Sequence, residues 1–99
     1  MKTYVLKVEP FMKFVEPKAQ ALKPLEEAAE VFGAWQASGI DGSYSITPEM
    51  REDIVYECFD TIQACVNLME SLGTTDSDLC EAARKVKQRN IERGRYDPY

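Results

Sequence analysis

The sequence predicts an all-α protein, a bundle of about three main helices in a single domain covering residues 1–99. Apolar residues recur at three- and four-residue spacings in three separate stretches, as expected for amphipathic helices. Proline, a capping residue or glycine bounds these stretches. A chain of 99 residues can bury one modest core, and its 44% hydrophobic and 29% charged residues are typical of a soluble globular protein.

The leader, residues 1–17, is predicted to be irregular or to contain a short strand. Residues 2–8 alternate loosely, which suits a short strand, an arm on a partner subunit or a mobile end. Pro10 and Pro17 restrict the residues before them and favour an irregular approach to the first helix. Lys7 and Glu9 interrupt the first apolar residues, so we expect no signal peptide.

The firm part of the first helix is predicted to begin near Lys23, because Pro24 is tolerated in a first turn, and a preceding turn from Lys18 is an option. Ser38 and Gly39 should end it, and the small and polar residues 39–43 should form a turn-rich connection. Its expected apolar face consists of Leu22, Leu25, Ala28, Ala29, Phe32 and Trp35.

The second helix is predicted to run from Pro48 to Leu72. Thr47 can cap its start, Pro48 suits the first helical position, and Gly73 is a natural stop. Its expected apolar face is broad and consists of Ile54, Val55, Cys58, Phe59, Ile62, Cys65, Val66 and Met69.

The third helix is predicted to begin near Thr75, which forms a pattern resembling a capping box with Asp78, and to end at Gly94. Its apolar residues are Leu79, Ala82, Ala83, Val86 and Ile91. The tail, residues 95–99, should be irregular.

Charge and composition exclude several classes of function. A net charge of −5 argues against duplex nucleic acid as a partner, because that affinity comes mainly from Lys and Arg on phosphates. No apolar run approaches the ~20 residues that cross a bilayer, so we expect no membrane contact and a cytoplasmic location.

The cysteines and the absent histidine narrow the chemistry further. Cys58, Cys65 and Cys80 have no close paired spacing, which favours neither a disulfide framework nor a zinc site, and we expect all three to be buried. Without histidine, the usual general base and every Ser–His or Cys–His nucleophile are missing. Any catalysis must therefore use carboxylates, lysines or a metal ion.

Two acidic pairs stand out, Glu27 with Glu30 and Glu57 with Asp60. Residues three apart lie about one helical turn apart, so each pair can direct two carboxylates into one volume. Converging carboxylates repel unless a cation lies between them, and Mg²⁺, with Mn²⁺ as an alternative, suits oxygen ligands. On helical wheels both pairs face away from the apolar residues, as in ordinary solvated surfaces. We therefore expect a metal site to need neighbouring helices, from another subunit.

The order of these acids resembles a known signature. Lys23-x-x-Glu26-Glu27-x-x-Glu30 followed by Glu57-x-x-Asp60 is similar to the EExxE and ExxD motifs of the MazG-like all-alpha nucleoside triphosphate pyrophosphohydrolases. Residues 26–35, 60–64 and 89–95 also look like short phage or Gram-positive members. The resemblance covers about residues 20–95.

This resemblance implies a MazG-like helical bundle completed by oligomerisation, as a homodimer or homotetramer, and an enzyme that cleaves a nucleoside triphosphate to nucleoside monophosphate and pyrophosphate. The first and second helices would bring Glu27, Glu30, Glu57 and Asp60 around Mg²⁺, and another subunit would help to cover the site. Glu26 would be a further acidic contributor, and either Glu26 or Glu27 would accept the proton of the attacking water. A metal-activated water makes histidine unnecessary.

Substrate recognition is less defined. Lys87, Asn90 and Arg93 lie three apart on the third helix and can face phosphate or sugar, or can simply form a basic helix end. Trp35, Tyr56 and Phe59 are candidates for base stacking or for core and interface packing. The base preference stays open. The alternative function is a non-catalytic helical binding or assembly protein, such as one of phage origin, whose acids are only solvated surface.

Overall fold

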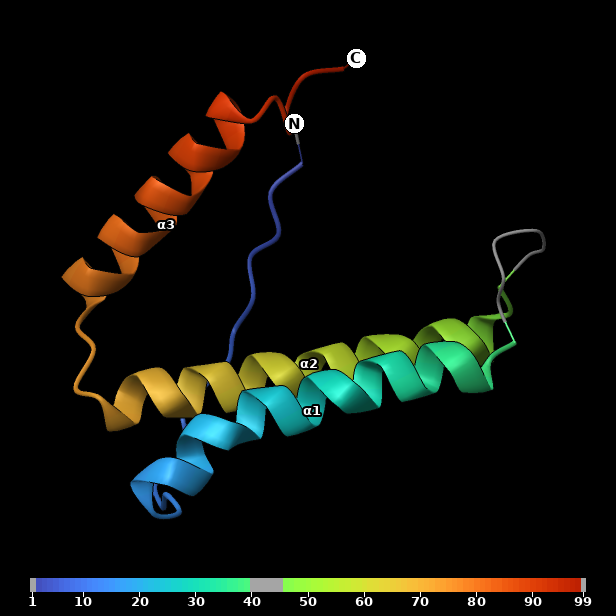
Figure 1. The fold of residues 1–99 in the computed structure, drawn as a ribbon, viewed down its shortest axis with the longest axis horizontal. Helices are drawn as coiled ribbons and strands as arrows, with labels where there is room; N and C mark the ends of the chain where they lie inside the picture. The colour runs from blue at the N-terminus through green and yellow to red at the C-terminus, as the bar shows by residue number, and fades with distance from the viewer. Residues whose placement is uncertain (1, 40–45, 99) are drawn as a thin grey trace.

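The computed structural model of the protein describes residues 2–39 and 46–98, and it contains three helices: α1 (Pro17–Ala37), α2 (Pro48–Ser71) and α3 (Asp76–Glu92). The expected all-helical class is confirmed. α1 and α2 run antiparallel, side by side, whereas α3 leaves the end of α2 and stands apart from the pair (Figure 1). Apart from Gly39, the connection expected at residues 39–43 lies outside the described residues.

The first helix begins six residues before the predicted firm start. Glu16 caps it, because its carboxylate accepts hydrogen bonds from the backbone N–H groups of Lys18 (3.1 Å) and Ala19 (2.6 Å), and Pro17 occupies the first position. Pro24 lies inside α1 and does not begin it. Its ring removes only one intrahelical donor, and the helix continues to Ala37.

The starts of the other two helices agree with the sequence. Thr47 caps α2 through a hydrogen bond from the Met50 N–H (3.2 Å). Thr75 and Asp78 form a capping box on α3, with bonds of 3.1 Å and 2.9 Å. Gly73 follows α2 with a φ of 75°, a left-handed conformation that favours glycine and ends this helix.

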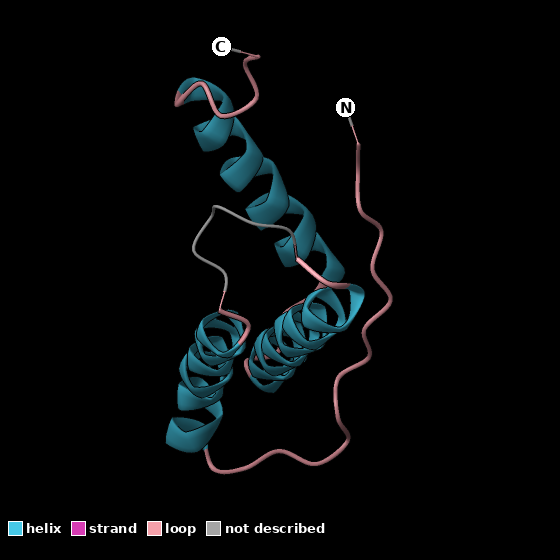
Figure 2. Ribbon diagram, turned by 90° about the vertical axis from the view of Figure 1, so that its right-hand side faces the viewer, coloured by secondary structure: helices cyan, strands magenta, loops and turns pink. Residues whose placement is uncertain are grey.

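The described leader, residues 2–16, is called the arm below and contains neither helix nor strand. It runs past α2 and turns back into the start of α1 (Figure 2). None of the helices in the described part of the chain is long and apolar enough to cross a membrane.

The packing of α1 against α2 differs from the sequence prediction. One set of buried or half-buried positions in α1 and its C-cap repeats at alternating spacings of four and three, and so does one such set in α2. In α1 these positions are Gln20, Pro24, Glu27, Val31, Ala34 and Ser38. In α2 they are Met50, Ile54, Glu57, Thr61, Ala64 and Leu68. We call this contact the seam, and it is built largely from small and polar residues.

The predicted apolar face of α1 is exposed throughout, whereas that of α2 is partly covered: its half-buried members are Ile54, Cys58, Ile62, Val66 and Met69. Leu25 is 68% exposed and Phe32 is 59% exposed, and the only buried residues in the described part of the chain are Gln20, Ala64 and Asn67. The cysteines were expected to be buried, and this expectation is wrong for Cys65 and Cys80, which are exposed on the outer surfaces of α2 and α3.

α3 has no contact with α1 or α2 and no buried residue within the part of the chain that the structure describes. This arrangement extends the molecule. Its radius of gyration is 16.1 Å, against about 13 Å for a compact domain of this length.

Candidate metal centre

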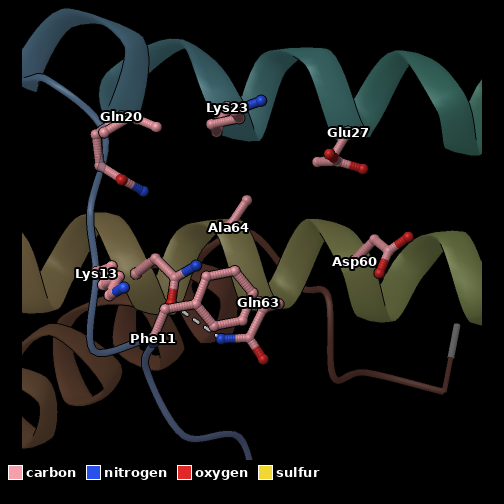
Figure 3. A pocket seen from close by; sticks show the side chains of 10 residues that line it. Phe11, Lys13, Gln20, Lys23, Glu27, Asp60, Gln63 and Ala64 are labelled. Atoms are coloured by element: carbon pink, nitrogen blue, oxygen red, sulfur yellow. Dashed lines mark hydrogen bonds between the residues drawn. The ribbon is translucent and has the colours of Figure 1, made fainter.

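Four carboxylates meet in the seam between α1 and α2. One oxygen from each of Glu27, Glu30, Glu57 and Asp60 lies within 4.8 Å of the other three. We call these four residues the acidic cluster. They are the four residues that the sequence predicts as metal ligands, two from each helix. Glu27 points from α1 toward α2, and Asp60 points from α2 toward α1 (Figure 3).

The four acids come together from the first and second helices, as the resemblance implies, and the neighbouring helix that each acidic pair needs comes from the same chain, not from another subunit. Both pairs do face away from the large apolar residues, as the wheels indicate. However, the seam positions of α1 lie off its predicted apolar face, so α1 turns the side that carries Glu27 toward α2. The acids therefore converge within one chain.

The dimensions of the acidic cluster suit a hard divalent cation. Mg²⁺ binds oxygen at 2.0–2.1 Å, so opposite ligands lie about 4 Å apart. The four oxygens span 4.8 Å, so a small inward movement would bring them to that separation. Three of the residues are half-buried and Glu30 is exposed, which leaves one side open to water or a ligand.

The electrostatics of the acidic cluster reflect four carboxylates held close together. Partial burial, together with repulsion from Glu30 and Asp60, raises the pKa of both Glu27 and Glu57 above the ordinary value of 4.5. Oε2 of Glu57 is buried and has no hydrogen-bond partner among the described residues. An orphaned carboxylate oxygen is costly, and a cation would remove that cost.

Glu26, the other predicted catalytic acid, lies outside the acidic cluster. Its carboxylate forms an ion pair with Lys23 at 3.4 Å, and both side chains are exposed. Glu27 thus lies among the candidate ligands, whereas Glu26 faces solvent one residue away.

The predicted substrate-binding residues Lys87, Asn90 and Arg93 are not brought to the acidic cluster within one chain. Lys87 and Asn90 lie on α3 and Arg93 is its C-cap, and α3 does not contact the helices that carry the acids. The aromatic candidates Trp35, Tyr56 and Phe59 are exposed, and none of them lines the cavity beside the acidic cluster.

Sequence reasoning missed that cavity. It has a volume of about 260 Å³ and lies between the arm, α1 and α2. Glu27 and Asp60 belong both to its lining and to the acidic cluster. The remaining lining residues are Phe11, Lys13, Val15, Gln20, Lys23, Gln63, Ala64 and Asn67. The sequence contains one signal that could have indicated this cavity. Polar residues recur at the repeating seam positions, and such a repeat indicates a polar contact between two helices.

Comparisons with protein-family models, with curated proteins and with solved structures found no match to this chain. The resemblance to the MazG-like pyrophosphohydrolases therefore stays a prediction from the residues. The geometry of the acidic cluster stands independently of it.

Proposed function

We propose that this protein is a Mg²⁺-dependent pyrophosphohydrolase that cleaves a nucleoside or deoxynucleoside triphosphate to the monophosphate and pyrophosphate. The observation that carries this proposal is the convergence of Glu27, Glu30, Glu57 and Asp60 from two helices, with an unpartnered buried oxygen on Glu57. A metal-activated water makes hydrolysis at neutral pH possible for a chain without histidine, and the order of the acidic motifs supports the same reaction.

Each part of the acidic cluster has a task in this reaction. The four carboxylates would hold the ion, and bound Mg²⁺ would supply neutralisation of phosphate charge and a water of lowered pKa. Water attacks the α-phosphorus, the bond to the bridging oxygen breaks, and pyrophosphate leaves. Of the two candidate bases, Glu27 is the better placed to accept the water's proton, because Glu26 faces solvent beside Lys23.

The proposal includes a homodimer or homotetramer in the cytoplasm, where nucleotides are found. The uncovered apolar residues of α1 and α2 and the isolated α3 support it, since an unsupported helix of this length is marginal in water. Charge supports it too. α2 has six acidic residues and one basic residue, whereas residues 84–95 have six basic residues and one acidic residue. Lys87, Asn90 and Arg93 of one copy would then approach the acidic cluster of another.

The direct test is release of pyrophosphate from a panel of nucleoside and deoxynucleoside triphosphates with Mg²⁺. Glu57→Gln and Asp60→Asn should each lower kcat/KM by at least about 100-fold, the upper end of what loss of a supporting residue causes at metal sites. Glu70→Gln is the matched control, because Glu70 is exposed on the same helix outside the acidic cluster. No turnover by the wild type, or full turnover by both variants, would remove the proposal.

Melting temperatures separate this function from the non-catalytic alternative. An ion that binds only the folded state raises the melting temperature. Mg²⁺ should therefore stabilise the wild type and Glu70→Gln, and should leave Glu57→Gln and Asp60→Asn unchanged. A helical assembly protein with merely solvated acids predicts no difference between these proteins.

A further inference from the structure

The cavity beside the acidic cluster has a wall that the chain holds in place by specific hydrogen bonds. The backbone N–H of Phe11 donates to Oδ1 of Asn67 at 2.9 Å. Nε2 of Gln63 donates to the carbonyl of Glu9 at 2.8 Å and to the same Asn67 oxygen at 3.0 Å. The arm is thus pinned to α2 at the residue whose ring faces the cavity.

These bonds also fix the orientation of both amides. A backbone N–H can only donate, so Asn67 must turn its oxygen toward the arm, and a carbonyl can only accept, so Gln63 must turn its nitrogen toward Glu9. Nδ2 of Asn67 and Oε1 of Gln63 make no hydrogen bond with any described residue. A donor and an acceptor therefore remain for a ligand.

The lining changes in character from one end of the cavity to the other (Figure 3). At one end are the carboxylates of Glu27 and Asp60. At the other are Lys13, Phe11, which is 57% exposed although its backbone N–H is bonded, and Gln20, which is only 4% exposed. An apolar ring held at a cavity rim can stack on a flat heterocycle, and buried amides can hydrogen-bond to its edge.

We propose that this cavity holds the base and sugar of the nucleotide, with Phe11 stacking on the base while the phosphates lie at the acidic cluster. The inference rests on the proposed function, because the shared residues Glu27 and Asp60 connect the two sites. A volume of about 260 Å³ is close to the lower end of the roughly 300–1,000 Å³ of small-molecule sites, which suits a single nucleoside.

The test compares Phe11→Ala with Phe14→Ala. Phe14 is on the same arm and is exposed, but it does not line the cavity. Loss of a stacking ring should weaken binding of deoxynucleoside triphosphates by roughly 5- to 150-fold. Inorganic tripolyphosphate, which has the charges but no base, should bind the variant and the wild type equally, and Phe11→Tyr should restore nucleotide binding. Calorimetry with Ca²⁺ in place of Mg²⁺ is designed to measure binding without turnover.

The outcomes separate the two proposals. Equal loss for nucleotide and tripolyphosphate, or no loss for either, overturns the role of Phe11 even if the wild type is an active enzyme. Conversely, a wild type without turnover removes the proposed activity. Calorimetry with deoxynucleoside monophosphates then still tests the cavity, because a loss in Phe11→Ala but not in Phe14→Ala requires stacking on the base. Circular dichroism melts should show that both variants keep the wild-type fold.

Discussion

The α1–α2 pair and α3 differ in which of their residues are enclosed. The pair encloses acidic and amide side chains in its seam and exposes its large apolar residues, such as Leu25 and Phe32. α3 encloses nothing, and both its apolar and its basic residues lie on its surface. The difference shows that the single chain already brings its candidate ligands together, while many of its large apolar side chains stay uncovered.

A charged residue placed on the apolar surface of α3 should have the largest effect of the substitutions proposed, and this effect should be on the oligomeric state. Val86 is 46% exposed on the same stripe of α3 as Leu79 and Ala83. If this stripe packs against another copy, Val86→Asp would bury a carboxylate without a partner, a cost of several kcal/mol. We expect the dissociation constant of the oligomer to rise by at least about 100-fold, as measured by light scattering over a dilution series.

Gln88→Asp is the matched control, because residue 88 lies on the opposite side of α3, where a carboxylate would stay in water. It should leave the oligomer intact. If Val86→Asp has the same mass as the wild type at every concentration, the stripe on α3 is not the interface.

The helices themselves could be predicted because their signals are local. Thr47 and the Thr75–Asp78 pair form the caps that their residue types indicate, and Gly73 ends α2 with the expected left-handed backbone. The start of α1 was harder to predict from the sequence. Pro24 resembled a helix start, whereas the Glu16 cap that overrides it depends on a side-chain conformation.

The candidate site was predictable only in part. Spacing of three placed Glu27 with Glu30 and Glu57 with Asp60 on each helix, and that is a property of one helix. Which faces of α1 and α2 contact each other depends on both helices together. Hydrophobicity favoured contact through residues such as Phe32, but the seam uses the repeat that contains Ala34 and Ala64. The cavity wall depends on contacts between the arm and α2, more than fifty residues apart in sequence, and no local pattern reveals these.

Equivalent cap substitutions test whether α3 is energetically coupled to the rest of the protein. Thr47→Ala and Thr75→Ala each remove a threonine oxygen that accepts a bond from the third residue after it. Such a loss costs about 0.5–2 kcal/mol of helix stability. For Thr47, in the packed pair, this should appear in the free energy of global unfolding measured by urea titration.

For Thr75 the result should depend on assembly. In a dissociated sample, such as Val86→Asp, Thr75→Ala should lower only the helical signal of α3, because α3 has no contact through which to affect the pair. In the oligomer it should lower global stability by about the same amount as Thr47→Ala. Equal global losses in both samples would mean that α3 is coupled to its own chain.

The smallest expected effect, and the most selective, is the response to pH. The carboxylates of the acidic cluster and those of α3 have pKa values shifted in opposite directions. Burial and repulsion from Glu30 and Asp60 raise the pKa of Glu27 and Glu57, whereas bonds from Thr75 lower the pKa of Asp78 and bonds from Arg84 and Lys85 lower that of Glu81. Thermal melts followed by circular dichroism, with EDTA and with Mg²⁺, should therefore resolve two separate windows.

Above pH 4.5 the folded acidic cluster binds more protons than the unfolded chain, so in EDTA its stability should fall as pH rises through the raised pKa values of Glu27 and Glu57. Mg²⁺ should remove this decline, because the cation replaces the protons, and Glu57→Gln should reduce it. Asp78 and Glu81 stabilise α3 when ionised, so the helical signal of α3 should be lost only as pH falls below about 4. A decline above pH 4.5 that is identical with EDTA and with Mg²⁺ would mean that general repulsion in an acidic chain, rather than the acidic cluster, causes it.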